Sequence, residues 1–363
     1  MEINKNNFSG TLKSKRSERE ARHAMLARKL ASEGIVLLKN EDMLPLDGSK
    51  PVALFGGGAD KTVKGGTGSG DVNNRENISI YKGLTDAGLS VTSSDWLLDY
   101  HERYIMARNV WKEKILEDAG KTEDTFDAYA RNPFMMPEGR KITKDDIYGA
   151  YVAVYVISRI SGEGKDRRII EGDYYLSQKE KEDILYLDKE DIPVVLILNT
   201  GAPVEISGIL QETSCIKAIL SISLPGQEGG HAVADVLLGK QVPCGKLSAT
   251  WAVHYEDYPS ATSFSYLDGN LAKEEYKEGI YVGYRYFSSF GINPLFPFGY
   301  GLSYTSFSIK CEEIKITRPG IEVVVTVENT GNCYSGREVV QVYITPPQTG
   351  LAKEYCRLAG FAK

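Results

Sequence analysis

The sequence predicts an α/β fold, in which a mostly parallel sheet carries helices on both faces, followed by a shorter all-β region. Two patterns carry this prediction. Between residues 31 and 302, short apolar and β-branched runs alternate with helical stretches, which is typical of a parallel sheet covered by helices. After residue 302 only strand-like runs follow, with alternating apolar and polar residues. A chain of 363 residues is long enough for two domains.

The elements follow from these patterns in order. The segment 150–158 is an almost unbroken apolar run, as expected for a central strand buried on both faces. An amphipathic helix over 17–32 is expected to turn Ala21, Met25, Leu26 and Leu30 toward the core. The other predicted strands are 35–38, 52–55, 194–199, 216–222, 304–309, 321–328 and 338–344, and the other helices are 78–87, 177–187 and 229–238.

Three domain-level segments are predicted: an N-terminal helical lead (1–30), an α/β-sandwich domain (31–302) and a partial β-sandwich (303–363). A complete sandwich of this kind needs about seven strands and roughly 100 residues. Half a sandwich would expose an apolar inner face and unpaired strand edges. The sequence therefore predicts that further strands complete this domain.

Composition narrows the function classes. The net charge of −6 argues against a nucleic-acid-binding protein, which would carry a basic surface. No stretch is apolar for long enough to cross a membrane, and the polar N-terminus lacks a signal-peptide core. The five cysteines are scattered and form no Cys-x-x-Cys pair, so we expect no zinc site, no disulfide framework and a cytoplasmic location.

Glu163 is the first candidate functional residue. It lies in the segment Ile160–Arg167, directly after the predicted central strand. Open α/β sheets contact their ligands at the carboxyl ends of the strands. Gly162 and Gly164 give the loop backbone freedom to direct a carboxylate into a cleft. The plainer alternative is a solvated acidic loop residue.

A glycine-rich loop, Lys64–Asp71, follows an earlier strand and has a competing interpretation as a phosphate cradle. No Gly-Lys-Ser/Thr ends it, and its glycines are not spaced as Gly-x-Gly-x-x-Gly. The segment 73–77 also separates it from the next predicted helix. A nucleotide site remains an alternative that these features disfavour.

Five motifs in order carry a resemblance to a known family. Together they resemble the α/β-sandwich domain of glycoside hydrolase family 3, and its β-glucosidases in particular, over residues 27–363. The region 303–363 is similar to the start of the family's fibronectin-type-III-like sandwich. The motifs are Lys64–Asp71, Ile160–Arg167, Pro225–Gly230, Tyr281–Tyr286 and Phe298–Tyr304.

The resemblance implies a retaining β-glucosidase that acts on β-glucosides or oligosaccharides and needs neither cofactor nor metal. Glu163 is then the general acid/base, and Ser69 in the glycine-rich loop reaches a sugar hydroxyl. The family's nucleophile is an aspartate in a Ser-Asp-Trp context on a (β/α)8 barrel. Ser94-Asp95-Trp96 has that context, but it lies in the α/β domain, so Asp95 is predicted to be a helix N-cap instead.

The barrel is therefore expected outside this chain, in the same polypeptide or as a second chain, and the chain alone is expected to be inactive. A homo-oligomer is compatible with the sequence. The leading alternative is a non-catalytic carbohydrate-binding or scaffold module. Replacing Glu163 by glutamine separates the two, because an enzyme loses turnover while a binding module keeps its sugar affinity.

Overall fold

The structure is a computed structural model that describes residues 15–162, 167–264, 272–273, 275–318 and 320–363. At its centre is a five-stranded sheet with the strand order β1-β5-β4-β3-β2. The strands β2, β3, β4 and β5 run parallel to one another, whereas β1 runs antiparallel to β5. Their bounds are β1 Val36–Asn40, β2 Val52–Phe55, β3 Val152–Ser158, β4 Val194–Asn199 and β5 Ile216–Ser221.

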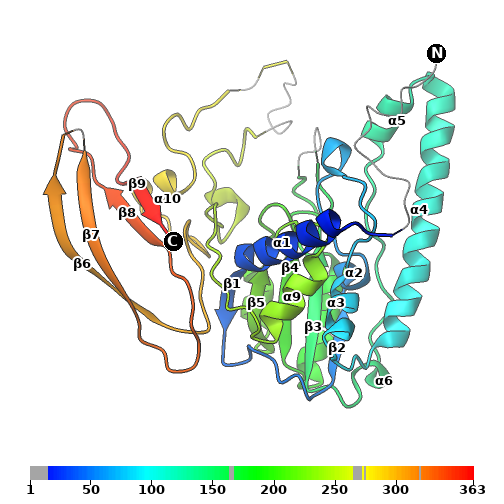
Figure 1. The fold of residues 1–363 in the computed structure, drawn as a ribbon. Helices are drawn as coiled ribbons and strands as arrows, with labels where there is room; N and C mark the ends of the chain where they lie inside the picture. Colours follow the sequence, from blue (N-terminus) through cyan, green and yellow to red (C-terminus); the bar gives the residue numbers. More distant parts are fainter. Residues whose placement is uncertain (1–14, 163–166, 265–271, 274, 319) are drawn as a thin grey trace.

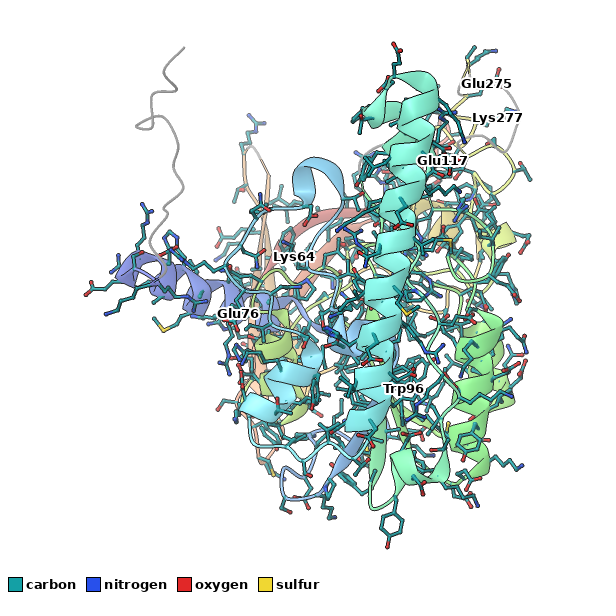
Figure 2. All side chains as sticks on the ribbon, turned by 90° about the vertical axis from the view of Figure 1, so that its right-hand side faces the viewer. Lys64, Glu76, Trp96, Glu117, Glu275 and Lys277 are labelled. Atoms are coloured by element: carbon teal, nitrogen blue, oxygen red, sulfur yellow. The ribbon has the colours of Figure 1, made fainter. Side chains whose placement is uncertain are left out.

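Helices cover both faces of this sheet. The first layer contains α1 (Glu18–Gly34), α3 (Ile80–Asp86) and α9 (Gly229–Leu237), which pack against one another in front of the sheet (Figure 1). Figure 2 shows the sheet nearly edge-on, with α7 (Gln178–Lys189) on the face opposite to α1. The shorter helices are α2 (Gly57–Asp60), α5 (Thr125–Arg131), α6 (Lys144–Ile147), α8 (Ser207–Glu212), α10 (Tyr284–Phe290) and the 3-10 turns Gly68–Gly70 and Tyr255–Asp257.

The central strands form because their sequences have no polar face. Every residue of β3 and β4 is buried, as parallel strands between two helix layers require. The predicted fold class, an α/β sandwich with a mostly parallel sheet followed by an antiparallel β region, is confirmed. The predicted bounds of β2 and β4 are those of the structure.

The predicted core-facing side of α1 is wrong. Met25, Leu26 and Leu30 are 65%, 53% and 59% exposed, and Ala24 is buried in their place. The helix is held to α9 by Arg28, whose Nε and Nη2 donate to the Asp235 carboxylate at 2.5 and 2.6 Å. The buried side of the helix therefore carries small residues, and the leucine and methionine pattern does not mark it.

The helix α4 (Ser94–Thr122) is the longest element and stands beside β2 (Figure 2, where Trp96 and Glu117 mark its two parts). Its N-cap is Ser93, whose hydroxyl donates to the Leu54 carbonyl oxygen and accepts from the Leu54 amide. Asp95 therefore lies in the first turn and not at the N-cap, which corrects the prediction by two residues. Trp96 is buried and packs edge-on against Phe55.

The all-β region contains two antiparallel pairs, β6 (Phe307–Ile316) with β7 (Ile321–Asn329) and β8 (Val340–Ile344) with β9 (Arg357–Ala362). The last of these strands was not predicted. A groove of about 1060 Å³ between the pairs has a mainly aliphatic and aromatic lining: Phe307, Ile321, Val323, Val325, Val327, Val340, Val342, Ile344 and Phe361.

Candidate active site

The candidate site lies where the parallel strands end, at the upper edge of the sheet in Figure 1. Four loops meet there, one after each of β2, β3, β4 and β5. Glu163 and Gly164 belong to the loop after β3 and lie outside the described residues. The flanking stems, which end at Gly162 and resume at Arg167, are described and can be built residue by residue.

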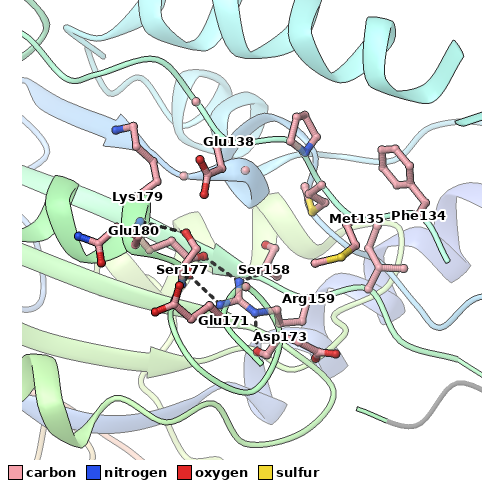
Figure 3. Close-up of a pocket in the computed structure, with 18 of the residues that line it drawn as sticks. Phe134, Met135, Glu138, Ser158, Arg159, Glu171, Asp173, Ser177, Lys179 and Glu180 are labelled. Carbon is pink, nitrogen blue, oxygen red and sulfur yellow. Dashed lines mark hydrogen bonds and ion pairs between the residues drawn. The ribbon is translucent and has the colours of Figure 1, made fainter. Parts of the chain in front are cut away.

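The stem before Glu163 is fixed by a buried arginine. Arg159, which directly follows β3, is only 6% exposed and forms a bidentate ion pair with Glu180, with both N–O distances at 2.7 Å. Its Nε donates to the backbone oxygen of Asp173 at 2.7 Å. Burying a guanidinium is costly unless its donors are satisfied, and here they are (Figure 3). This stem is therefore held in one position.

The stem after Glu163 is bound to Asp173, the residue whose backbone oxygen also accepts from Arg159. Arg167 pairs with the Asp173 carboxylate through Nε, and its Nη2 donates to the Asp173 backbone oxygen at 2.7 Å. The amide of Arg168 donates to the second carboxylate oxygen of Asp173 at 2.9 Å. Burial lowers the pKa of the Arg167 guanidinium, while Asp173 acts in the opposite direction. Both ends of the loop thus converge on Asp173.

The glycine-rich loop docks on the first stem. The amide of Thr67 donates to the oxygen of Ser161 at 2.9 Å, and Thr67 forms a parallel bridge with Gly162. A Cβ on Gly162 would lie 2.0 Å from Thr67 Oγ1 and 2.6 Å from its backbone nitrogen. The φ of Gly162 is not in the left-handed region, so this glycine is needed for close approach and not, as predicted, for unusual backbone angles.

Ser69, the predicted sugar contact, belongs to the 3-10 turn Gly68–Gly70 of the glycine-rich loop. Its side chain lies outside the described residues. The base of the loop is held by Lys64, whose Nζ donates to Asn74 Oδ1 at 2.6 Å and lies 3.3 Å from the Asp71 carboxylate. The polar contacts of the Lys64 side chain are therefore with the loop itself and with the segment that directly follows it.

A pocket of about 560 Å³ opens beside the two stems (Figure 3). One wall is apolar and contains Phe134 and Met135, and the other carries the Arg159–Glu180 pair. At its border the hydroxyl of Tyr155 donates to Asp183 at 3.2 Å, and Lys179 pairs with the same carboxylate. These charged groups are bound to one another, and the Arg159–Glu180 pair holds the first stem.

Asp183 should make the free energy of unfolding depend on pH. Burial raises the pKa of the Asp183 carboxyl, although Lys179 and Tyr155 act to lower it. The folded protein then binds more protons than the unfolded chain, so the free energy of unfolding falls as the pH rises through and above the ordinary aspartate range. We expect Asp183→Asn to remove this contribution, so its stability relative to the wild type should increase from pH 3 to pH 7. Urea unfolding across that range measures it, and a pH-independent difference would contradict the assignment.

Other polar residues that attracted attention lie elsewhere or have structural partners. Asp95 is at the opposite edge of the sheet, next to the bridge between Val52 and Val91 at the start of β2, far from the four loops. His231 lies between the carboxylates of Glu228 and Asp86, at 2.7 and 2.9 Å. In the described part of the chain no group of three or more His, Cys, Asp or Glu side chains could hold a metal ion. None of the described helices is long and apolar enough to cross a membrane.

Comparisons with known proteins show which family the chain belongs to. The sequence profile of the glycosyl hydrolase family 3 C-terminal domain matches residues 35–304, which include the whole five-stranded sheet and the four loops. The chain belongs to glycoside hydrolase family 3. The family match ends just before β6, so it covers the α/β part and not the antiparallel pairs.

Individual relatives extend the match to the rest of the chain. Beta-glucosidase A of Butyrivibrio fibrisolvens is 33% identical over an alignment that covers 94% of this chain and 44% of that protein. The structure of β-glucosidase 3B from Thermotoga neapolitana, in complex with glycerol, has 38% identity and a TM-score of 0.78, covering 94% of this chain and 46% of that one. A β-glucosidase from Paenibacillus barengoltzii has a TM-score of 0.80 at 35% identity, covering 93% of this chain and 36% of that one. The chain spans less than half the length of these relatives.

Sequence reasoning missed Asp173 and Glu180, the two carboxylates that hold the stems. Both lie within twenty residues of Glu163, in a segment that reads as a polar loop and a helix start. Glu180 also completes the capping box of α7 with Ser177. The Ser-x-x-Glu spacing that predicts a helix start was thus the visible signal, and it does not reveal the second bond to Arg159.

Proposed function

We propose that this chain is the acid/base-bearing part of a retaining β-glucosidase. Membership of family 3 and relatives named β-glucosidases over 94% of the chain support the proposal. One observation carries the assignment of the site: the segment that contains Glu163 begins and ends on stems that are both bound to Asp173, at the carboxyl edge of the sheet. A carboxyl group presented between fixed stems suits a general acid.

The proposed chemistry uses two carboxyl groups about 5–5.5 Å apart on opposite sides of the glycosidic bond. Glu163 donates its proton to the leaving oxygen while a carboxylate nucleophile attacks the anomeric carbon, which gives a covalent glycosyl-enzyme. Glu163 then takes a proton from water, whose oxygen displaces the nucleophile. The negative nucleophile and partial desolvation would raise the pKa of the Glu163 carboxyl toward neutrality. Ser69 would bind a sugar hydroxyl in this site.

The nucleophile is proposed to lie on a (β/α)8 barrel outside these 363 residues, and the strands β6 to β9 to belong to a fibronectin-type-III-like sandwich. The proposed substrates are terminal, non-reducing β-D-glucosyl residues of oligosaccharides or glycosides. A structure of the Thermotoga neapolitana relative in complex with α-D-glucose, with a TM-score of 0.79 to this chain, supports a glucose-sized sugar site.

Two covalent labels test the proposal in the active enzyme that contains this chain. A 2-deoxy-2-fluoro-β-glucoside with an activated leaving group traps the glycosyl-enzyme on the nucleophile. An N-bromoacetyl-β-glucosylamine carries an electrophile where the leaving group would lie and alkylates the acid/base. Peptide mass spectrometry should place the second label on Glu163 and the first on a residue outside residues 1–363.

The isolated 363-residue chain is the control, and we expect it to gain no fluoroglucosyl mass. A fluoroglucosyl adduct on any of its peptides, Asp95 included, would show that the chain carries its own nucleophile. Alkylation of a different carboxylate in the active enzyme would remove Glu163 from the proposed role.

A further inference from the structure

Asn199 is a fully buried and fully hydrogen-bonded amide at the candidate site. It is the last residue of β4 and is 0% exposed. A buried amide that loses its hydrogen bonds destabilises the fold, so its partners show what it holds together. These partners are the last residue of β3 and the segments that follow β2 and β5.

Four hydrogen bonds use the donor and acceptor capacity of the Asn199 amide. Its Oδ1 accepts from the Val63 amide at 2.7 Å and from the Ser158 hydroxyl at 3.0 Å. Its Nδ2 donates to the Val63 oxygen at 2.9 Å and to the Ser223 oxygen at 2.8 Å. The side chain therefore binds both backbone groups of Val63, much as a neighbouring strand would.

This bonding joins loops whose strands are not neighbours. Strand β3 lies between β4 and β2, so Asn199 reaches across the end of β3, at Ser158, to the segment that follows β2. On its other side it holds Ser223, whose φ of 49° is unusual for a residue other than glycine. A backbone held in such a conformation requires support from its surroundings, and Asn199 supplies it.

Val63 immediately precedes the glycine-rich loop. Four residues later, the Thr67 amide donates to Ser161, two residues before Glu163. The oxygen of Lys64 accepts from the Gly226 amide at 2.9 Å, which ties the same loop to the segment after β5. Asn199 thus fixes the base of the loop whose tip forms a bridge with the stem of Glu163 at Gly162.

We propose that Asn199 is a positioning residue for the general acid/base, acting through Val63 and the Thr67–Gly162 bridge. It sets the register of the glycine-rich loop against the stem that ends at Gly162 and leads into Glu163. This inference rests on the proposed role of Glu163. It adds a single polar side chain that couples the two loops.

The test combines hydrogen exchange on this chain with kinetics on the active enzyme. For Asn199→Ala we expect the Val63 and Thr67 amides to exchange roughly tenfold faster, since two hydrogen bonds to Val63 are lost. Amides within β4 should stay protected. In the enzyme, kcat/KM for a glucoside with an alkyl leaving group should fall about 10²-fold, and less for a dinitrophenyl glucoside that needs no protonation.

Two further variants keep the test decisive if Asn199→Ala fails to fold. Asn199→Asp preserves shape and replaces the two donors by an acceptor, and Ser158→Ala removes one bond without adding charge. Both are expected to show the same dependence on the leaving group, more weakly for Ser158→Ala. Asn40→Ala is the matched control: Asn40 makes three hydrogen bonds, to Leu44 and Met43, at the opposite edge of the sheet.

If the Thr67 amide exchanged at the same rate in Asn199→Ala as in the wild type, Asn199 would not couple the two loops. This conclusion would hold whether or not Glu163 is the general acid/base. Faster exchange with an equal loss on both glucosides would show a purely structural role for Asn199. If Glu163→Gln itself lacked a dependence on the leaving group, the proposed function would fall together with the catalytic part of this inference. The exchange data would still decide whether Asn199 couples the loops.

Discussion

Replacing Glu163 by glutamine should lower kcat/KM about 10²–10⁴-fold on glucosides with poor leaving groups. Glutamine has the shape of glutamate but no proton to give to the departing oxygen. That loss corresponds to about 3–5 kcal/mol of transition-state stabilisation. Dinitrophenyl glucosides release dinitrophenolate, a stable anion, so their kcat/KM, which reports formation of the glycosyl-enzyme, should depend much less on Glu163. Steady-state kinetics of the active enzyme on both substrate classes measures the difference.

The control for this experiment is Glu117→Gln, the same chemical change at an exposed position of α4. It should leave both rates unchanged. Addition of azide to a Glu163→Ala variant should restore turnover of the dinitrophenyl glucoside with formation of β-glucosyl azide, because a small anion fits where the carboxylate was. An equal loss on both substrate classes, without azide rescue, would contradict the acid/base role.

Replacing Gly230 by alanine should destabilise the fold by about 1–3 kcal/mol, since added volume in a close contact forces the backbone to move. A Cβ on Gly230 would lie 1.9 Å from the Ser79 oxygen, where α9 and α3 approach each other. The atom in the way is backbone, and the Gly230 amide donates to Ile78 nearby at 3.0 Å. No rotation of a side chain can relieve the contact.

The matched control is Gly120→Ala, in the exposed C-terminal part of α4, where an added Cβ would have no neighbour within 4 Å. Alanine is the better helix former, so this variant should gain about 0.5–1 kcal/mol. Thermal and urea unfolding of both variants should give midpoint shifts of opposite sign. A higher midpoint for both variants would show that helix propensity, and not the contact with Ser79, dominates at Gly230.

The sheet could be predicted from sequence because its strands are buried on both faces. A run such as Val194–Asn199 has no competing polar face, and the structure gives it the predicted bounds. The direction and place of β1 could not be predicted, since a short apolar run carries no information on whether its neighbour is parallel or antiparallel. The pattern in α1 was misleading because the buried residues of this helix, Ala24 and Ser32, are small and are not part of the leucine and methionine pattern.

The candidate site, like the sheet, could be predicted only in part from the sequence. Its loops were found because glycines and charges interrupt apolar runs at the carboxyl ends of strands. The residues that organise the loops were not found, because Asn199 and Asp173 look like ordinary polar residues until their partners are known. Asn199 is 136 residues from Val63, and a spacing of that length leaves no periodicity to read.

The position of β1 has a consequence for how the chain is made. The first two strands in sequence, β1 and β2, are the two outermost strands of the sheet. Val36 pairs with Ser221, at the end of β5, which is the last strand of this sheet to be synthesised. At about 5–20 residues per second, β1 leaves the ribosome about 10–35 s before its partner exists. During that time Leu37 and Leu38, both buried in the finished fold, have no strand beside them. The pairing of β1 must therefore wait for β5, whereas β2, β3 and β4 can pair with one another before then.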